Sequence, residues 1–204
     1  MMALLSFMRR LPVALACLFA VSATAPQSVT VQIFNQHGMP VQGAVVEIAP
    51  PPGSTRALAF PWRNAMAQHN LAFKPGTLIV PVGTDVAFPN LDAVRHSIYS
   101  FSKIARFQID LYGRDQTRSQ RFMVPGTVAL GCNIHDKMRG YVRVVTTPFA
   151  AATDLNGLGR IDGLAPGSYR ITIWHPRLRG AANETGQTVV FAPGKPARVT
   201  MEER

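Results

Sequence analysis

The chain has 204 residues, and its 21 Lys and Arg residues outnumber 11 Asp and Glu residues, which gives a formal net charge of +10. This length allows one large or two small domains. The basic residues are scattered and no aromatic/basic motif accompanies them, which argues against a nucleic-acid partner and favours acidic proteins or anionic membrane surfaces. No P-loop, G-x-S-x-G or H-E-x-x-H motif is present, so the sequence does not predict an enzyme.

The first 25 residues have the pattern of a secretory leader. Basic residues in Met8–Arg10 precede the apolar run Leu11–Val21, which is too short to span a bilayer. Small residues follow and predict cleavage near Ala23 or Ala25, with export to the periplasm. Acylation of Cys17 as a lipoprotein and a twin-arginine export route remain open alternatives. No later stretch is long and apolar enough to predict a transmembrane span.

Cleavage would leave a single thiol in the chain. Removal of the leader takes away Cys17, Arg9 and Arg10. The remaining 19 basic and 11 acidic residues give a formal charge of +8. In an oxidising compartment the unpaired Cys132 indicates an intermolecular disulfide, a reactive thiol or a metal ligand. A buried and inert cysteine is the remaining alternative.

Short β-type runs separated by Gly, Pro and Asn account for most of the remaining chain. Turn signals about 8–12 residues apart predict an all-β sandwich or barrel. No long amphipathic helix is indicated, and at most a turn or two of helix is expected over Pro61–His69. The expected strands, in chain order, are Val29–Phe34, Val41–Ile48, Leu78–Val82, Asp85–Phe88, His96–Phe101, Phe107–Leu111, Arg121–Val124, Thr127–Gly131, Tyr141–Thr146, Arg160–Leu164, Tyr169–Trp174, Thr188–Phe191 and Arg198–Met201.

Four residues form a candidate metal site. Cys132, His135 and Met138 have C-x2-H-x2-M spacing, and His96 lies upstream in a predicted strand. One thiolate and two imidazoles suit a trigonal copper site with a weak axial thioether, and such sites transfer electrons. Structural zinc is less favoured, because it usually takes several thiolates or pairs of histidines. His37, His69 and His175 are interpreted as non-ligands.

Two segments resemble the halves of a cupredoxin, the small blue-copper domain. Leu71–Asn90, followed by His96, resembles its N-terminal half, and Cys132–Val144 resembles its C-terminal end. The resemblance implies a Greek-key β-sandwich that binds one type 1 copper ion. The four candidate residues would be its ligands, with His135 nearest to solvent as the port for electrons. Asn90 and Ser97 would support the ligands by hydrogen bonding, although many cupredoxins carry Asn where Ser97 stands.

The whole chain resembles the exported, cupredoxin-containing methylamine utilisation protein family, through the strings HSIYSFS, LGCNIHDKM and ITIWHPRL. Val29–Pro50 and Thr153–Ile173 resemble parts of a carboxypeptidase regulatory-like β-sandwich. We therefore expect residues 26–58 and 147–204 to form one discontinuous domain, with a cupredoxin domain at 59–146 inserted into it. A single larger sandwich is the alternative.

These features predict an exported protein that carries single electrons between redox partners and is not itself an enzyme. Arg95, Lys103, Lys137 and Arg139 would form a basic rim for an acidic partner, such as a dehydrogenase or a cytochrome. Two other functions stay open at this point. One is a periplasmic copper carrier or buffer, and the other is a non-redox assembly factor for a dehydrogenase system.

Overall fold

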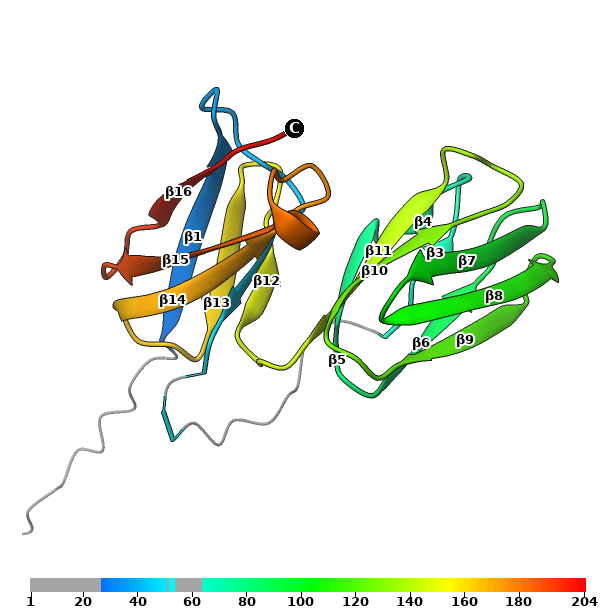
Figure 1. Cartoon of the computed structure of the whole chain (residues 1–204), viewed down its shortest axis with the longest axis horizontal. Coiled ribbons are helices and arrows are strands. Elements are labelled where there is room, and N and C mark those ends of the chain that lie inside the picture. The colour runs from blue at the N-terminus through cyan, green and yellow to red at the C-terminus, as the bar shows by residue number, and fades with distance from the viewer. Residues whose placement is uncertain (1–26, 51, 54–63) are drawn as a thin grey trace, which may run out of the picture.

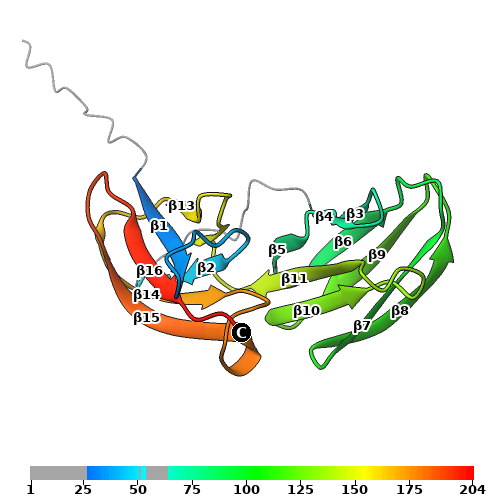
Figure 2. The same cartoon turned by 90° about the horizontal axis from the view of Figure 1, so that it is seen from above.

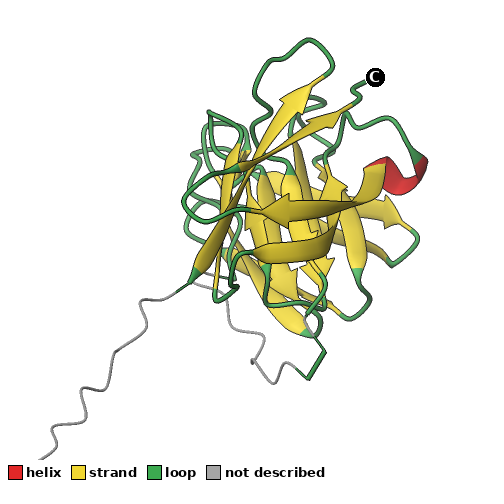
Figure 3. Cartoon of the chain, turned by 90° about the vertical axis from the view of Figure 1, so that its left-hand side faces the viewer, coloured by secondary structure: helices red, strands yellow, loops and turns green. Residues whose placement is uncertain are grey.

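The computed structural model describes residues 27–50, 52–53 and 64–204. The predicted leader and the predicted boundary between residues 58 and 59 lie outside these residues. The described chain is all-β, as the sequence predicts, with a single short 3₁₀ turn at Ala181–Asn183 (Figure 3). Within the described residues, no helix is long and apolar enough to cross a membrane.

The strands form two units that lie side by side, drawn on the left and right of Figure 1. The left unit contains a three-stranded sheet in the order β13-β1-β16 and a four-stranded sheet in the order β12-β2-β14-β15. We call it the flanking sandwich. Its strands are β1 (Ser28–Asn35), β2 (Val45–Ile48), β12 (Ala150–Ala152), β13 (Leu158–Asp162), β14 (Gly167–Trp174), β15 (Glu184–Phe191) and β16 (Ala197–Met201).

The right unit, which we call the central sandwich, contains all four candidate ligands. Its main sheet has five strands in the order β5-β11-β10-β7-β8, and the two-stranded sheets β6-β9 and β3-β4 complete it. These strands are β3 (Ala67–Gln68), β4 (Phe73–Lys74), β5 (Thr77–Pro81), β6 (Thr84–Pro89), β7 (His96–Ser102), β8 (Ala105–Tyr112), β9 (Thr117–Phe122), β10 (Gly126–Gly131) and β11 (Arg139–Val145).

Alternation of apolar residues explains the two separate cores. In β1 the side chains of Val29, Val31 and Ile33 are buried, and the residues between them are not. Successive residues of a strand point to opposite faces, so this pattern buries one face of the strand. The chain leaves the flanking sandwich after β2, which Figure 2 labels, and returns to it at β12, which Figure 1 labels and which pairs with β2. The expected domain boundaries themselves stay predictions.

Several expected elements differ from the structure. The strand expected at Arg121–Val124 is β9, which begins and ends earlier, and the described part of the expected helical turn forms strand β3 instead. Gly140 lies outside the expected strand Tyr141–Thr146, but in the structure it lies inside β11. Its backbone lies so close to Phe73 that a Cβ atom there would come within 2.9 Å of that side chain. A glycine therefore stands there because of a close approach rather than a turn.

Strand β11 joins the two units because both of its faces are buried. Val142 and Val144 face the core of the central sandwich, whereas Tyr141, Arg143 and Val145 face the flanking sandwich. A small apolar cluster lies between the units, and the ring of Tyr141 packs edge-on against that of Trp174, with centroids 5.2 Å apart. The cluster consists of Val45, Ile79, Val145, Ala150 and Trp174.

Arg143 makes the main polar connection between the units. Its guanidinium is 6% exposed and forms ion pairs with Glu47 of β2 and Glu184 of β15. It also donates a hydrogen bond of 2.9 Å to Thr127 Oγ1 of β10. Burial raises the pKa of Glu47, although the charge of Arg143 opposes that shift. One cation thus compensates two largely buried carboxylates across the junction.

Replacing Arg143 should therefore cost much stability. In Arg143→Met the two carboxylates lose their cation, and breaking a buried pair costs about 3–5 kcal/mol. Burial raises the pKa of Glu47, so ionising this carboxylate without its cation costs free energy. The loss of stability in the variant should therefore grow as pH rises and Glu47 becomes ionised. Urea denaturation at several pH values measures both effects. The matched variant Arg106→Met removes an exposed arginine and should change stability by less than ~0.5 kcal/mol. Equal losses in the two variants would contradict this account.

Candidate metal centre

Three predicted ligands meet at one end of the central sandwich. His96 begins β7, Cys132 directly follows β10, and His135 lies in the loop between β10 and β11. Strands β7 and β10 are antiparallel neighbours, which brings residues 36 positions apart in the chain together. One ligand atom from each of the three residues lies within 4.8 Å of the other two, so the group could hold a metal ion.

The two imidazoles direct nitrogen atoms toward the centre. His96 Nδ1 lies 3.8 Å from Cys132 Sγ, and the centroids of the His96 and His135 rings are 5.1 Å apart. Nδ1 of His135 is buried and has no hydrogen-bond partner among the described residues. Burying a polar atom without a partner costs free energy, and a metal ion in this position would remove that cost. The donor set of two imidazole nitrogens and one sulfur therefore fits a soft or borderline metal ion.

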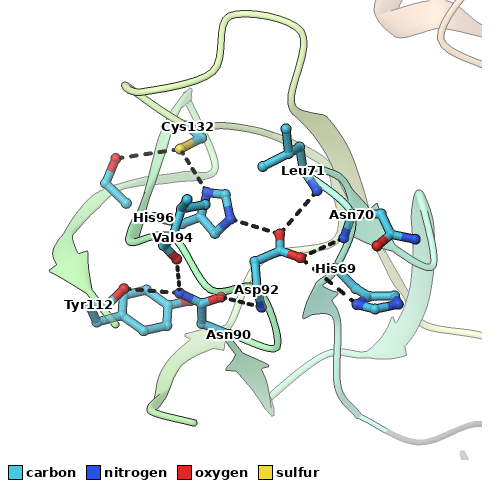
Figure 4. A network of polar contacts seen from close by, with 10 residues as sticks. His69, Asn70, Leu71, Asn90, Asp92, Val94, His96, Tyr112 and Cys132 are labelled. Carbon is cyan, nitrogen blue, oxygen red and sulfur yellow. Dashed lines mark hydrogen bonds and ion pairs between the residues drawn. The ribbon is translucent and has the colours of Figure 1, made fainter. Parts of the chain in front are cut away.

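Asp92 is a functional residue that the sequence analysis missed. Its Oδ2 lies 2.9 Å from His96 Nε2, on the side of the ring away from Cys132 (Figure 4). This contact leaves Nδ1 of His96 free to face the thiol, since a neutral imidazole carries only one N–H. The only sequence signal is its position four residues before His96. A carboxylate on the far nitrogen of a ligating histidine is a recurrent means of fixing that ring.

The Asp92 carboxylate also holds a neighbouring turn. The backbone N–H groups of Asn70 and Leu71 donate hydrogen bonds of 2.7 and 3.0 Å to its two oxygens (Figure 4). Both turn residues have positive φ angles, 54° and 55°, which an L-residue such as Leu71 adopts at some cost. Burial alone would raise the pKa of Asp92, but the hydrogen bonds from His96, Leu71 and Asn70 lower it below its ordinary value.

Asn90 and Ser97, the two predicted supporting residues, are both buried beside the centre. Asn90 Nδ2 donates to the carbonyls of Val94 and Tyr112, and its Oδ1 accepts the N–H of Asp92 at 2.9 Å. It thereby shapes the loop that carries Asp92, and it contacts no ligand directly in these hydrogen bonds. Ser97 Oγ accepts the N–H of Asn133 at 3.1 Å and lies 3.9 Å from Cys132 Sγ. The hydroxyl of Ser97 thus holds the loop after Cys132.

Met138 lies in the apolar core below the centre. It is 1% exposed and belongs to the same buried cluster as Cys132. Its N–H donates a hydrogen bond of 2.8 Å to the carbonyl of His135, which closes the loop into a turn. Axial ligation by its thioether stays a prediction. Of the four predicted ligands, His135 is the one that is partly exposed, and the other three are buried.

The three remaining histidines lie outside this group. His37 is exposed in the turn after β1, and His175 is buried in the flanking sandwich near Glu203. His69 is half exposed, and its Nδ1 lies 3.9 Å from Asp92 Oδ1. It therefore adjoins the hydrogen-bond network without belonging to the group of ligand atoms.

The surroundings of Cys132 favour its thiolate over its thiol. Burial would raise its pKa, but the backbone N–H groups of Ile134 and Ser97 and the imidazoles of His96 and His135 lower the pKa to about 6. A thiolate, not a thiol, is the form that binds metals. The protein thus offers an anionic sulfur at neutral pH before any metal binds.

Several solved structures are similar to part of this chain. A mutant of amicyanin in its oxidised state is 25% identical, with a TM-score of 0.38 over 40% of this chain and 80% of its own. A purple cupredoxin from Nitrosopumilus maritimus is 24% identical, with a TM-score of 0.37 over 40% of this chain and 98% of its own. A copper-containing nitrite reductase from Thermus scotoductus is 25% identical, with a TM-score of 0.40 over 48% of this chain and 26% of its own.

No protein-family model matches the sequence, and no curated protein matches it significantly. The similar solved structures named above are thus cupredoxins and one copper enzyme, each matched over less than half of this chain. What the centre can do is therefore inferred from its own residues.

The ionisation of Cys132 can be measured in the metal-free protein. We expect the ultraviolet absorbance of the thiolate to titrate with a midpoint near pH 6. Because this pKa is below that of an unfolded thiol, the thiolate stabilises the fold above about pH 8.5, and this stabilisation is lost as pH falls through 6. His135→Gln should move the midpoint to higher pH, and His37→Gln should not. A midpoint near that of a free thiol would refute the proposed environment.

Proposed function

We propose that this protein binds one type 1 copper ion and carries single electrons between redox partners in the periplasm. The observation that carries the proposal is the convergence of a buried thiol and two imidazole nitrogens, one of which has no other partner. His96, Cys132 and His135 would be the strong ligands, and Met138 the weak axial one. Copper in such a site exchanges one electron between its two oxidation states.

The residues around the centre favour a rigid and enclosed site. Asp92 fixes the His96 ring, Asn90 holds the loop that carries Asp92, and Ser97 holds the loop after Cys132. With four protein ligands the site would have no open position for a substrate, which is why we propose a carrier and not an enzyme. His135 would face the partner, because it is the most exposed of the four and follows Ile134, an apolar residue that is 52% exposed.

The partner would be an acidic protein, such as a dehydrogenase or a cytochrome. Arg95, Lys137 and Arg139 of the predicted basic rim are exposed. Lys103 is exposed as well, but it follows the end of β7 that is opposite to His96 and is therefore not part of a rim around His135. Charges at the rim of an interface chiefly speed association with a partner of opposite charge. We further propose export through the leader at residues 1–25, a role in methylamine utilisation, and an accessory role for the flanking sandwich. The export rests on the residue pattern of the leader, and the other two points rest on the sequence resemblance.

The visible spectrum is the primary test of the proposed function. Copper-loaded protein should show a strong sulfur-to-copper absorption when oxidised, and Cys132→Ser should abolish it because the thiolate is lost. Met138→Leu should shift the band and the reduction potential, whereas Met123→Leu, at a side chain that is 58% exposed, should change neither. A colourless Cu(II)-loaded protein would exclude a type 1 site. A coloured protein that passes Cu(I) to acceptor proteins without a reversible redox couple would instead be a copper carrier.

Asp92→Asn tests the support of His96. The amide cannot match the carboxylate as an acceptor for His96 Nε2–H, so the imidazole should bind copper less well and the reduction potential should rise. Loss of such a supporting partner typically weakens metal affinity by about 10-fold or more. Competition titration with a chelator measures the affinity, and cyclic voltammetry measures the potential. Asp110→Asn, at an exposed carboxylate on β8, is the matched control. Equal affinities in the two variants would show that the Asp92–His96 contact is not needed.

A further inference from the structure

A groove crosses the outer face of the main sheet of the central sandwich, from the ends of the loop that carries His135 toward the flanking sandwich. It consists of two adjoining hollows of about 430 and 610 Å³, which share Ser102, Ala129 and Tyr141 in their linings. The first hollow begins at Gly131 and Arg139, and the second extends to the junction with the flanking sandwich. We call this feature the sheet-face groove.

Small residues on β10 form the floor of the groove, and aromatic residues form its walls. A Cβ atom on Gly131 would overlap the ring of Tyr99, its direct neighbour on β7. Tyr99 packs in turn against Phe101, with ring centroids 5.1 Å apart, and Phe101 is 72% exposed. Exposed aromatic residues beside a hollow are typical of protein–protein contact surfaces.

The groove carries a positive charge that no described acidic side chain compensates. Lys103 and Arg139, near its two ends, are exposed, and neither forms an ion pair with a described residue. The one carboxylate side chain in the lining, that of Glu184, is already paired with Arg143. A second copy of this chain is a poor occupant, because facing grooves would bring lysine and arginine side chains of like charge together.

We propose that the sheet-face groove is a docking surface for an acidic segment of a partner protein. The aromatic walls would contact its apolar atoms, and Lys103 and Arg139 would pair with its carboxylates. Such a partner would lie against the ring of Tyr99, which covers Gly131, the residue that precedes the proposed ligand Cys132. The redox role of that partner rests on the proposed function, whereas the docking surface itself does not require a bound metal.

Nuclear magnetic resonance on the metal-free, full-length protein tests the surface independently of copper. The paramagnetic trianion hexacyanochromate(III) should broaden the amide signals of Ser102, Lys103, Ala129, Gly131 and Arg139 at low salt. Lys103→Glu should reduce this broadening about twofold or more, because it reverses the charge at one end of the groove. Lys195→Glu makes the same charge change at an exposed site in the flanking sandwich and should not reduce it.

An acidic pentapeptide with a central tyrosine tests the aromatic walls. Its chemical-shift effects should map to the same residues and should weaken in Phe101→Ser. Broadening confined to residues 133–137, or an equal decrease in the Lys103 and Lys195 variants, would overturn the proposal. A concentration-dependent dimer in sedimentation velocity that Phe101→Ser abolishes would overturn it as well, since the occupant would then be a second copy. Copper loading and its spectrum would be unaffected by any of these outcomes.

Discussion

The hydrogen bond between Asp92 and His96 is the contact on which the arrangement of the centre depends. It selects the nitrogen that faces Cys132, and the same carboxylate holds the backbone of the turn at Asn70 and Leu71. One partly buried side chain thus joins β7 to the hairpin between β3 and β4. Asn90 extends this network by binding the N–H of Asp92. The orientation of the His96 ring is therefore held by residues 70–71 and 90–92, and not by the sequence around Cys132.

Strand β11 connects the two sandwiches of the molecule. It follows the loop of the centre, contributes alternate residues to two cores, and carries Arg143 into the junction. A buried cation between two carboxylates is costly to break and adds little stability over an apolar replacement, but it specifies one arrangement of the surrounding groups. The two sandwiches are therefore in direct contact at this junction, where the flanking sandwich covers part of one face of the main sheet at β5 and β11.

The sequence predicts those features whose signal is local. Strict alternation of apolar residues predicts β1, and C-x2-H-x2-M spacing predicts Cys132, His135 and Met138 as candidate ligands. Arg143 and Tyr99 carry no such signal, because their roles come from partners that only the folded chain brings near. Asp92 lies four residues before His96, but only the structure shows that its carboxylate reaches the ring. Gly140 is ambiguous in the sequence for a related reason: glycine marks both turns and close approaches, and only the position of Phe73 shows which applies here.

The double burial of β11 bears on any attempt to dissect the protein. A fragment restricted to residues 59–146 would retain every candidate ligand, yet it would expose the apolar side chains of Ile79 and Val145 to water. It would also leave Arg143 without Glu47 and Glu184. An apolar patch on an open sheet face invites self-association. The flanking sandwich thus covers apolar and charged side chains that the sheet bearing the centre would otherwise expose.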